Sequence, residues 1–259
     1  AVLGFLIIEN RVRHEERINF RLIADRQVSA IEQQLHRNLE TVHSLGGLFD
    51  ASEVVSGKEF TIFARQMVAR VRGVHALSWN PRVSEARLTD IKRLARREGM
   101  ARYDFYERGA GGVRQPLQSR DDYIPILYIE PRAQNQAALG FDIGSNSMRR
   151  QALDKARDTG EIVATAPIRL VQETGKQSGI LVLRPVYING ERPDTVERRR
   201  QSIKGYAVGV YRVGDMLAAA SETVGVTPKH IALFDETDQS RPPQSMFVSA
   251  RYTADDGRF

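Results

Sequence analysis

The sequence predicts an α+β fold in which a long N-terminal helix precedes subdomains built on antiparallel sheets. Residues 9–50 contain no proline, and no glycine before Gly46, as an uninterrupted helix requires. After the next helix, the patterns run in the order strand, helix, strand, strand, helix and then three strands. Neighbouring strand patterns grouped in this way are typical of an antiparallel sheet rather than a doubly wound parallel one.

Apolar side chains form a heptad-like stripe along the predicted helix. The stripe, with one polar residue at a core position, is Val28, Ile31, Leu35, Asn38, Val42, Leu45 and Phe49. One interpretation is a helix folded along the domain's own core, and another is a stalk that pairs with its twin. The two are compatible, because different parts of one stripe can face different partners. We assign residues 1–52 to a membrane-proximal end and stalk, and we expect a parallel homodimer held by the stripe from Val28 to Leu45, with Asn38 fixing the register.

The first eight residues are apolar or glycine, and charges begin at Glu9. Eight residues cannot span a bilayer, since a spanning helix needs about 20. They are either the outer end of a transmembrane helix or an apolar first turn packed on a core. We favour the membrane helix.

The segment 53–212 carries the patterns of a complete subdomain. Ser56 and Glu59 form a capping box before a helix at 60–72, and Gly73 ends that helix. Strands are expected at 74–79, 103–106 and 123–129, with a charged helix between Ser84 and Gly99. A second helix, capped by Ser145 or Ser147, should end at Gly160, and strands at 162–171, 179–188 and 206–213 follow it.

The remaining residues, 213–259, predict a helix at 215–224 and then two short strands. They are too few for a whole second sheet domain, so we expect an incomplete one, with the boundary near residues 211–215.

Composition narrows the function. Cysteine is absent, which excludes disulfides, Cys-based zinc sites and thiol catalysis. The formal net charge is +6, but the arginines are interleaved with acids. The densest run, residues 197–200 (Glu-Arg-Arg-Arg), is interpreted as a solvated loop, with a lipid-headgroup or nucleic-acid contact as the alternative. We expect no nucleic-acid partner.

No pattern of an enzyme is present. The histidines show no metal spacing, and neither a phosphate-binding loop nor a nucleophile elbow occurs. The glycine-rich stretch 109–112 lacks the spacing and the following helix of a phosphate cradle. We expect neither catalytic residues nor a metal or cofactor.

The middle of the chain resembles the CHASE sensory domain. The blocks that carry the resemblance stand in the family's order: 59–60 (Glu-Phe), 77–83 (Leu-Ser-Trp-Asn-Pro-Arg-Val), 123–126 (Tyr-Ile-Pro-Ile), 130–131 (Glu-Pro), 139–142 (Leu-Gly-Phe-Asp), 149–153 (Arg-Arg-Gln-Ala-Leu), 165–171 (Thr-Ala-Pro-Ile-Arg-Leu-Val), 185–187 (Pro-Val-Tyr) and 205–209 (Gly-Tyr-Ala-Val-Gly). Each block alone is weak, but so many in the right order are specific.

The resemblance implies an architecture and a location. CHASE domains are extracytoplasmic sensors of histidine kinases, diguanylate cyclases and nucleotide cyclases, held between two transmembrane helices. They combine a long stalk helix with tandem PAS-like subdomains, of which the membrane-distal one binds a small ligand, such as a cytokinin in plant receptors. By this resemblance 53–212 is the distal subdomain and 213–259 the proximal one. The domain would face the periplasm or the extracellular space.

The resemblance also implies ligand-binding residues. An aspartate before the Tyr-x-Pro strand, which bonds the adenine ring in plant receptors, corresponds to Asp121. Side chains alternate along a strand, so Asp121 and Tyr123 should share the pocket face while Asp122 faces solvent. Further ligand contacts fall on Phe141, Thr165, Arg169 and Tyr187. Phe141 departs from the leucine usual in the plant pattern. For Tyr123, Phe141 and Tyr187, ordinary sheet core is the alternative.

Two hypotheses of function follow. The first is a small-molecule sensor, with cytokinin- or adenine-like ligands as candidates, that signals through a dimeric stalk to a histidine kinase or diguanylate cyclase. The second is a structural dimerisation or periplasmic protein-interaction module without a ligand. A pocket lined by convergent polar groups would distinguish the first from the second.

Overall fold

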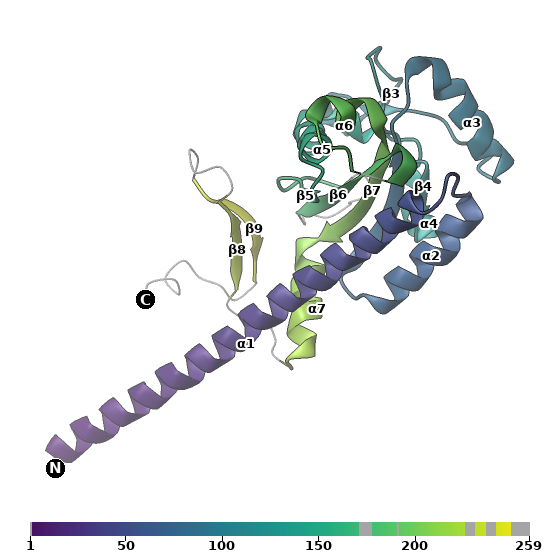
Figure 1. Cartoon of the computed structure of the whole chain (residues 1–259). Coiled ribbons are helices and arrows are strands. Elements are labelled where there is room, and N and C mark those ends of the chain that lie inside the picture. Colours follow the sequence, from purple (N-terminus) through teal and green to yellow (C-terminus); the bar gives the residue numbers. More distant parts are fainter. Residues whose placement is uncertain (1, 171–177, 191, 226–230, 237–241, 250–259) are drawn as a thin grey trace.

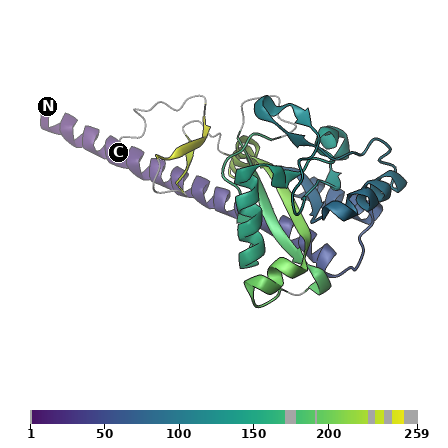
Figure 2. The ribbon, with the colours of Figure 1, turned by 90° about the horizontal axis from the view of Figure 1, so that it is seen from above.

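The computed structural model describes residues 2–170, 178–190, 192–225, 231–236 and 242–249, with side chains of the first helix described from Arg17 onward. Helix α1 (Val2–Asp50) is a single helix of 49 residues. Its C-terminal part lies along the globular part of the chain, while its N-terminal part projects far beyond it (Figures 1 and 2). The predicted long N-terminal helix is therefore confirmed.

A five-stranded antiparallel sheet forms the centre of the fold. Its strand order is β4-β1-β7-β6-β5, and each adjacent pair is antiparallel. The strands are β1 (Val74–Pro81), β4 (Tyr128–Glu130), β5 (Val163–Ala164), β6 (Gly179–Tyr187) and β7 (Ile203–Arg212). The predicted α+β class with an antiparallel sheet is confirmed.

Helices and loops cover both faces of this sheet. One face, the α5 face, packs against α5 (Ser147–Thr159) and the segment 124–143. The opposite face, the α1 face, packs against α1, α2 (Gly57–Arg70), α3 (Leu88–Arg97) and α7 (Val213–Thr223). Alternation along β7 assigns the faces, because Val208 and Val210 join the α5-face core while Ala207 and Tyr211 join the cores on the α1 face.

Smaller elements complete the described chain. They are the strands β2 (Glu107–Arg108) and β3 (Arg114–Gln115), the helices α4 (Arg132–Asn135) and α6 (Val196–Ser202), and the 3₁₀ turns Glu85–Arg87, Ala110–Gly112, Gln136–Ala138, Ile143–Ser145 and Ile188–Gly190.

Helix α1 is fixed to the sheet by close packing and by one hydrogen bond. Gly209 permits the approach, because a Cβ there would lie 2.6 Å from Val42 Cγ2. The Tyr211 hydroxyl donates to the backbone carbonyl of Asn38 across 2.9 Å. Leu45 is fully buried in the core between α1, α2 and the sheet. These contacts tie the C-terminal half of α1 rigidly to β7.

The expected dimer stripe divides into two parts. Asn38, Val42 and Leu45 are at most 2% exposed, because the chain's own sheet covers them. They are therefore not free for a second protomer, and that part of the prediction is wrong. Ile31 packs at the edge of the same core, whereas Val28 (54%) and Leu35 (39%) remain exposed.

Local signals were accurate where a cap or glycine fixes the backbone. The capping box of Ser56 and Glu59 is present, and Gly160 ends α5 in the left-handed conformation. The N-cap of α5 is Asn146, so the predicted cap at Ser145 or Ser147 is wrong by one residue. The strand expected at 103–106 is wrong, because within that range only Tyr106 forms a β-bridge. Tyr103 is held instead by its side chain, whose hydroxyl donates to the Ile126 carbonyl.

The arginine-rich run at 197–200 forms helix α6 rather than a solvated loop. Thr195 caps this helix. The buried Arg199 side chain donates to the backbone carbonyls of Asp158, Pro193 and Asp194. Free carbonyls at the C-terminus of α5 attract a guanidinium, so the run docks on α5.

After α7 the described residues include a two-stranded sheet, β8 (Ala232–Asp235) with β9 (Gln244–Val248). β7 ends at Arg212 and α7 begins at Val213. The side chains of α7, including Val213 and Leu217, pack with Val42 of α1 in a core on the α1 face of the sheet. The division into 53–212 and 213–259 stays a prediction, as does the incompleteness of the second part.

Candidate functional site

A small cavity lies inside the α5-face core. Its volume is about 20 Å³, room for about one water molecule. Most of its wall is apolar, and the apolar lining is Ile126, Ile129, Ala138, Phe141, Ile143, Leu170, Leu181, Val208 and Val210. Three polar side chains also reach it: Ser78, Asn80 and Arg149. An apolar cavity with a few convergent polar groups is the usual form of a small-molecule site.

Strand β1 provides the polar floor. Ala76, Ser78 and Asn80 alternate toward the α5 face, while Leu77 and Trp79 face α1. Ser78 Oγ donates to Asn80 Oδ1 across 2.8 Å. Asn80 is fully buried, and its Nδ2 has no hydrogen-bond partner. Buried polar groups are normally hydrogen-bonded, so the unpaired amide nitrogen of Asn80 calls for an explanation.

The first turn of α5 brings Arg149 to the cavity. The Asn146 side chain accepts from the Arg149 backbone N–H, which fixes the start of the helix. The Arg149 side chain is only 7% exposed. Its Nη2 donates to the Arg169 carbonyl across 3.0 Å, while its Nε has no partner. Burial, and next the charge of Arg108, lowers the pKa of Arg149 to about 10, so the guanidinium is charged at neutral pH.

A tight turn places Phe141 beside Arg149. Gly140 has φ +79°, and a Cβ there would lie 2.0 Å from the Asp104 carbonyl oxygen, so only glycine fits. The Phe141 ring packs with Tyr106, and the Arg149 guanidinium carbon lies 5.2 Å from the Phe141 ring centroid. A cation over an aromatic face is stabilised by the ring quadrupole.

The predicted orientation of the aspartate pair is reversed. Asp121 is exposed, whereas Asp122 is 6% exposed. Bridging to the sheet begins only at Tyr123, so strand alternation does not extend back to Asp121. Asp122 Oδ2 pairs with Arg82 Nε at 2.7 Å, and Asp122 Oδ1 with Arg150 Nη1 at 2.5 Å. Asp121 as the pocket carboxylate is therefore wrong.

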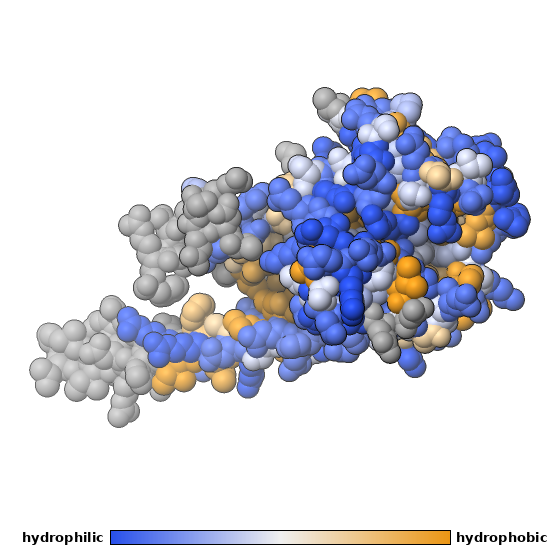
Figure 3. All heavy atoms as spheres, turned by 45° about the horizontal axis from the view of Figure 1, so that its top comes forward, coloured by the Kyte–Doolittle hydropathy of each residue, from blue (hydrophilic) through white to orange (hydrophobic). Residues whose placement is uncertain are grey.

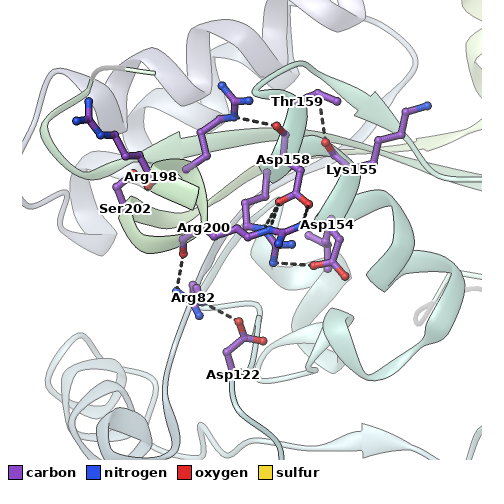
Figure 4. A network of polar contacts seen from close by, with 12 residues as sticks. Arg82, Asp122, Asp154, Lys155, Asp158, Thr159, Arg198, Arg200 and Ser202 are labelled. Carbon is purple, nitrogen blue, oxygen red and sulfur yellow. Dashed lines mark hydrogen bonds and ion pairs between the residues drawn. The ribbon is translucent and has the colours of Figure 1, made fainter. Parts of the chain in front are cut away.

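Asp122 belongs to a chain of ion pairs that one hydrogen bond closes into a ring; we call it the arginine ring, and Figure 4 shows this region from close by. Its members, in order of contact, are Arg82, Asp122, Arg150, Asp154, Arg157, Asp158 and Arg200. Arg82 Nη1 closes the ring by donating to the Arg200 carbonyl at 3.1 Å. The ring joins the end of β1, the segment before β4, α5 and α6.

Each of the three aspartates in the ring pairs with two of its four arginines. Burial opposes ionisation of Asp122, but hydrogen bonds from Arg150 and Arg82 outweigh it and lower its pKa. Hydrogen bonding from Arg200 and then the bond from Arg157 lower the pKa of Asp158 despite its partial burial. Asp122 and Asp158 are thus held in their ionised form by arginines.

The other predicted ligand contacts do not line the cavity. Tyr123 is buried and its hydroxyl donates to the Gln118 carbonyl. The Thr165 hydroxyl accepts from the Leu181 N–H, and Tyr187 donates to the Arg157 carbonyl. Arg169 is exposed. Among the predicted site residues, only Phe141 reaches the cavity, and ligand contacts at the others stay predictions.

Sequence reasoning missed Ser78, Asn80 and Arg149. A signal existed for two of them: Ser78 and Asn80 occupy alternate positions of a strand predicted to be buried, where apolar residues are expected. Arg149 carries no such signal, because it stands beside a second arginine in a helix with several charges.

The described residues contain no group of His, Cys, Asp or Glu that could hold a metal ion. None of the helices in the described ranges is both long enough and apolar enough to cross a bilayer.

Comparison with known proteins gives the class of the domain. The model of the CHASE domain family matches residues 53–247, well over half of the chain. This chain therefore belongs to the CHASE domain family, a family of sensor domains, as the sequence resemblance predicted.

Relatives with curated descriptions are histidine kinases. The chain is 27% identical over 228 residues to hybrid signal transduction histidine kinase A of Dictyostelium discoideum, covering 85% of this chain and 10% of that protein. It is 27% identical over 146 residues to probable histidine kinase 4 of Oryza sativa subsp. japonica, covering 54% of this chain and 14% of that protein. The chain thus spans only a small part of these kinases. Among solved structures, an extracellular ligand binding receptor from Desulfohalobium retbaense is similar at a TM-score of 0.46 and 10% identity, over 81% of this chain and 28% of that one.

Proposed function

We propose that this chain is the extracytoplasmic, non-catalytic sensor part of a membrane receptor, and that a small molecule binds in the cavity beneath β1. The observation that carries the proposal is the pair of buried donors, Asn80 Nδ2 and Arg149 Nε, left without partners around one cavity. Native cores rarely leave such groups unpaired unless they serve a function. Membership of a sensor family supports the same conclusion.

The sheet offers a direct route from the cavity to α1. Val208 and Val210 of β7 line the cavity, while the intervening Gly209 contacts Val42 of α1 on the other face. Tyr211, next along the strand, bonds α1 at Asn38. A ligand that widens the cavity must displace β7 or α5, and a displaced β7 moves α1 with it.

We further propose that α1 pairs with its twin through the exposed part of its stripe, at Val28 and Leu35. Apolar side chains are visible along the projecting part of α1 (Figure 3), and Ile18, Phe20, Leu22, Ile23 and Val28 are each at least 46% exposed. Apolar surface of this kind is usually covered by a partner. In the receptor, α1 would continue toward a membrane helix, and the output domain would be a histidine kinase or diguanylate cyclase. The naming of the relatives as histidine kinases supports the former.

A cavity-filling variant tests ligand binding. Ala138 is buried and lines the cavity, whereas the adjacent Ala137 is exposed. Ala138→Val should abolish binding of any ligand found by thermal-shift screening of charged and neutral metabolites, and Ala137→Val should leave it unchanged. If no compound raises the melting temperature, or if both variants bind equally, the module has no ligand here and the structural or protein-interaction alternative replaces our proposal.

Sedimentation tests the dimer. Association of the wild-type chain should depend on concentration, and Leu35→Asp should abolish it. Ile62→Asp, a matched change on an exposed apolar residue of α2, should not. Association that survives Leu35→Asp would refute the interface.

A further inference from the structure

Arg149 brings a positive charge to the cavity without a carboxylate to balance it. The other arginines on α5 differ: Arg150 pairs with Asp122 and Asp154, and Arg157 pairs with Asp154 and Asp158. Arg149 makes no ion pair with any described residue, and its side chain bonds only the neutral carbonyl of Arg169. A buried charge left without a counter-charge is strongly disfavoured, so the missing partner requires an explanation.

The unpaired atoms at the cavity are all donors. Asn80 uses its Oδ1 to accept from Ser78, which leaves the Nδ2 protons without an acceptor. Arg149 Nε is likewise a donor, because a guanidinium has no acceptor atom. The complementary guest must therefore bring acceptor atoms, and next to Arg149 it is favoured if it carries negative charge.

Further positive charge surrounds the site. The Arg114 guanidinium carbon lies 4.0 Å from the Tyr106 ring centroid, the Tyr106 and Phe141 ring centroids are 5.4 Å apart, and Arg149 lies over Phe141. These contacts form a stack from the exposed Arg114 to the cavity. The nearby acids Glu107 and Asp142 share one guanidinium, since Arg120 bonds each of them. Arg114 and Arg149, at the two ends of the stack, favour an anionic guest.

We propose that the ligand of this cavity is a small organic carboxylate, whose oxygens accept hydrogen bonds from Arg149 Nε and Asn80 Nδ2 and whose apolar part lies among Ile126, Leu181 and Val208. This inference rests on the proposed function, because it names the chemical class of the sensed molecule. The cavity as it stands accommodates little more than a water-sized group. The apolar part must therefore displace lining side chains, and displacement of Leu181 on β6 or Val208 on β7 links binding to movement of the sheet.

Isothermal titration with matched acid and amide probes tests the proposal. Acetate, butyrate and benzoate are each compared with acetamide, butyramide and benzamide, which have the same shape without the charge. At least one acid should bind at millimolar or lower concentration and about tenfold or more tightly than its amide. Arg149→Met should weaken that binding by about tenfold or more, a decade for each ~1.4 kcal/mol. Arg169→Met, an exposed arginine nearby in the fold, should leave it unchanged.

Each other outcome contradicts the carboxylate. If the amides bind as tightly as the acids, the ligand need not be charged. The same holds if adenine binds and Ala138→Val abolishes that binding. Either result would overturn the carboxylate but leave the proposal of a small-molecule sensor standing. Saturable binding of chloride or sulfate without any carboxylate would mean an inorganic ion site instead. No binding by any probe would remove both proposals.

A second variant keeps the test decisive. If Arg149→Met does not fold by circular dichroism, Arg149→Lys decides, because lysine keeps the charge but lacks the planar Nε donor. Weakened yet detectable binding of the acid is expected there. Unchanged binding of the acid in Arg149→Lys and in Asn80→Leu together would show that neither donor contacts it.

Discussion

Two arginine-rich regions of this domain differ in how their charges are compensated. In the arginine ring, Asp122 lies between Arg82 and Arg150 at distances of 2.7 and 2.5 Å, and every carboxylate has arginine partners. At the cavity, Arg149 has a carbonyl and an aromatic ring but no carboxylate among the residues that the structure describes. The ring joins secondary-structure elements and is explained by the folded chain itself. The donors at the cavity are left without partners, and this difference is the basis of our proposal that a ligand binds there.

The largest effect should come from breaking the ring. Asp122→Ala leaves Arg82 and Arg150 without their shared carboxylate, and loss of one partner of a buried pair costs about 3–5 kcal/mol. Because both arginine side chains are about one-third exposed, solvent screening should reduce the loss in free energy of unfolding to about 2 kcal/mol. Asp121→Ala, on the exposed neighbour, should change it by less than about 0.5 kcal/mol. Urea denaturation of the two variants measures the difference; equal losses would contradict the placement of the pair.

Acid should weaken the arginine ring through Asp122. The pKa of Asp122 lies below its ordinary value of 3.8 in the folded chain. Its ionised form thus contributes stability that is present above about pH 4 and is lost as the pH falls through the folded pKa. The buried Asp142 acts in the opposite direction, since burial raises its pKa. The stability difference between wild type and Asp122→Asn therefore isolates Asp122, and it should shrink as the pH falls below about 4. A constant difference down to about pH 3 would contradict the assignment.

A carboxylate introduced into the cavity wall should balance the charge of Arg149, as the aspartates of the arginine ring balance its arginines. Asn80→Asp places a negative charge at the cavity wall that Arg149 also lines. We expect the ligand-free domain to gain about 1 kcal/mol in free energy of unfolding and to lose affinity for carboxylate probes. Ser78→Asp, which places the charge two residues earlier on the same strand face, serves as a comparison. Stronger carboxylate binding in Asn80→Asp would contradict our account of the cavity.

The smallest effect should be at Arg169. The sequence resemblance selected its side chain, but the structure uses its backbone carbonyl, which accepts from Arg149. Arg169→Ala retains that carbonyl, so it should change stability by less than about 0.5 kcal/mol and leave ligand affinity unaltered. Thermal-shift titration measures both; a tenfold loss of affinity would restore the original prediction.

The comparison also shows what the sequence could predict. Features fixed within a few residues were predictable: the capping box of Ser56 and Glu59, and the glycine that ends α5. The errors concern adjacent residues of the same type. Asp121 and Asp122, or Arg149 and Arg150, have nearly identical local sequence, and only tertiary packing decides which one is buried and what it meets. The stripe on α1 failed similarly at Val42 and Leu45, because an apolar stripe does not reveal whether a sheet or a second helix covers it.

The most direct test of unmatched charge at the cavity compares Arg149→Met with Arg150→Met, without ligand. Arg150→Met breaks ion pairs with Asp122 and Asp154, and it should lower the free energy of unfolding by about 2 kcal/mol. Arg149→Met removes a buried charge that lacks a carboxylate, and it should raise the free energy of unfolding by about 1 kcal/mol. Opposite signs for two neighbouring arginines are the result that our account predicts. A similar loss of stability in both variants would show that Arg149 is a structural residue like Arg150, and would contradict the account.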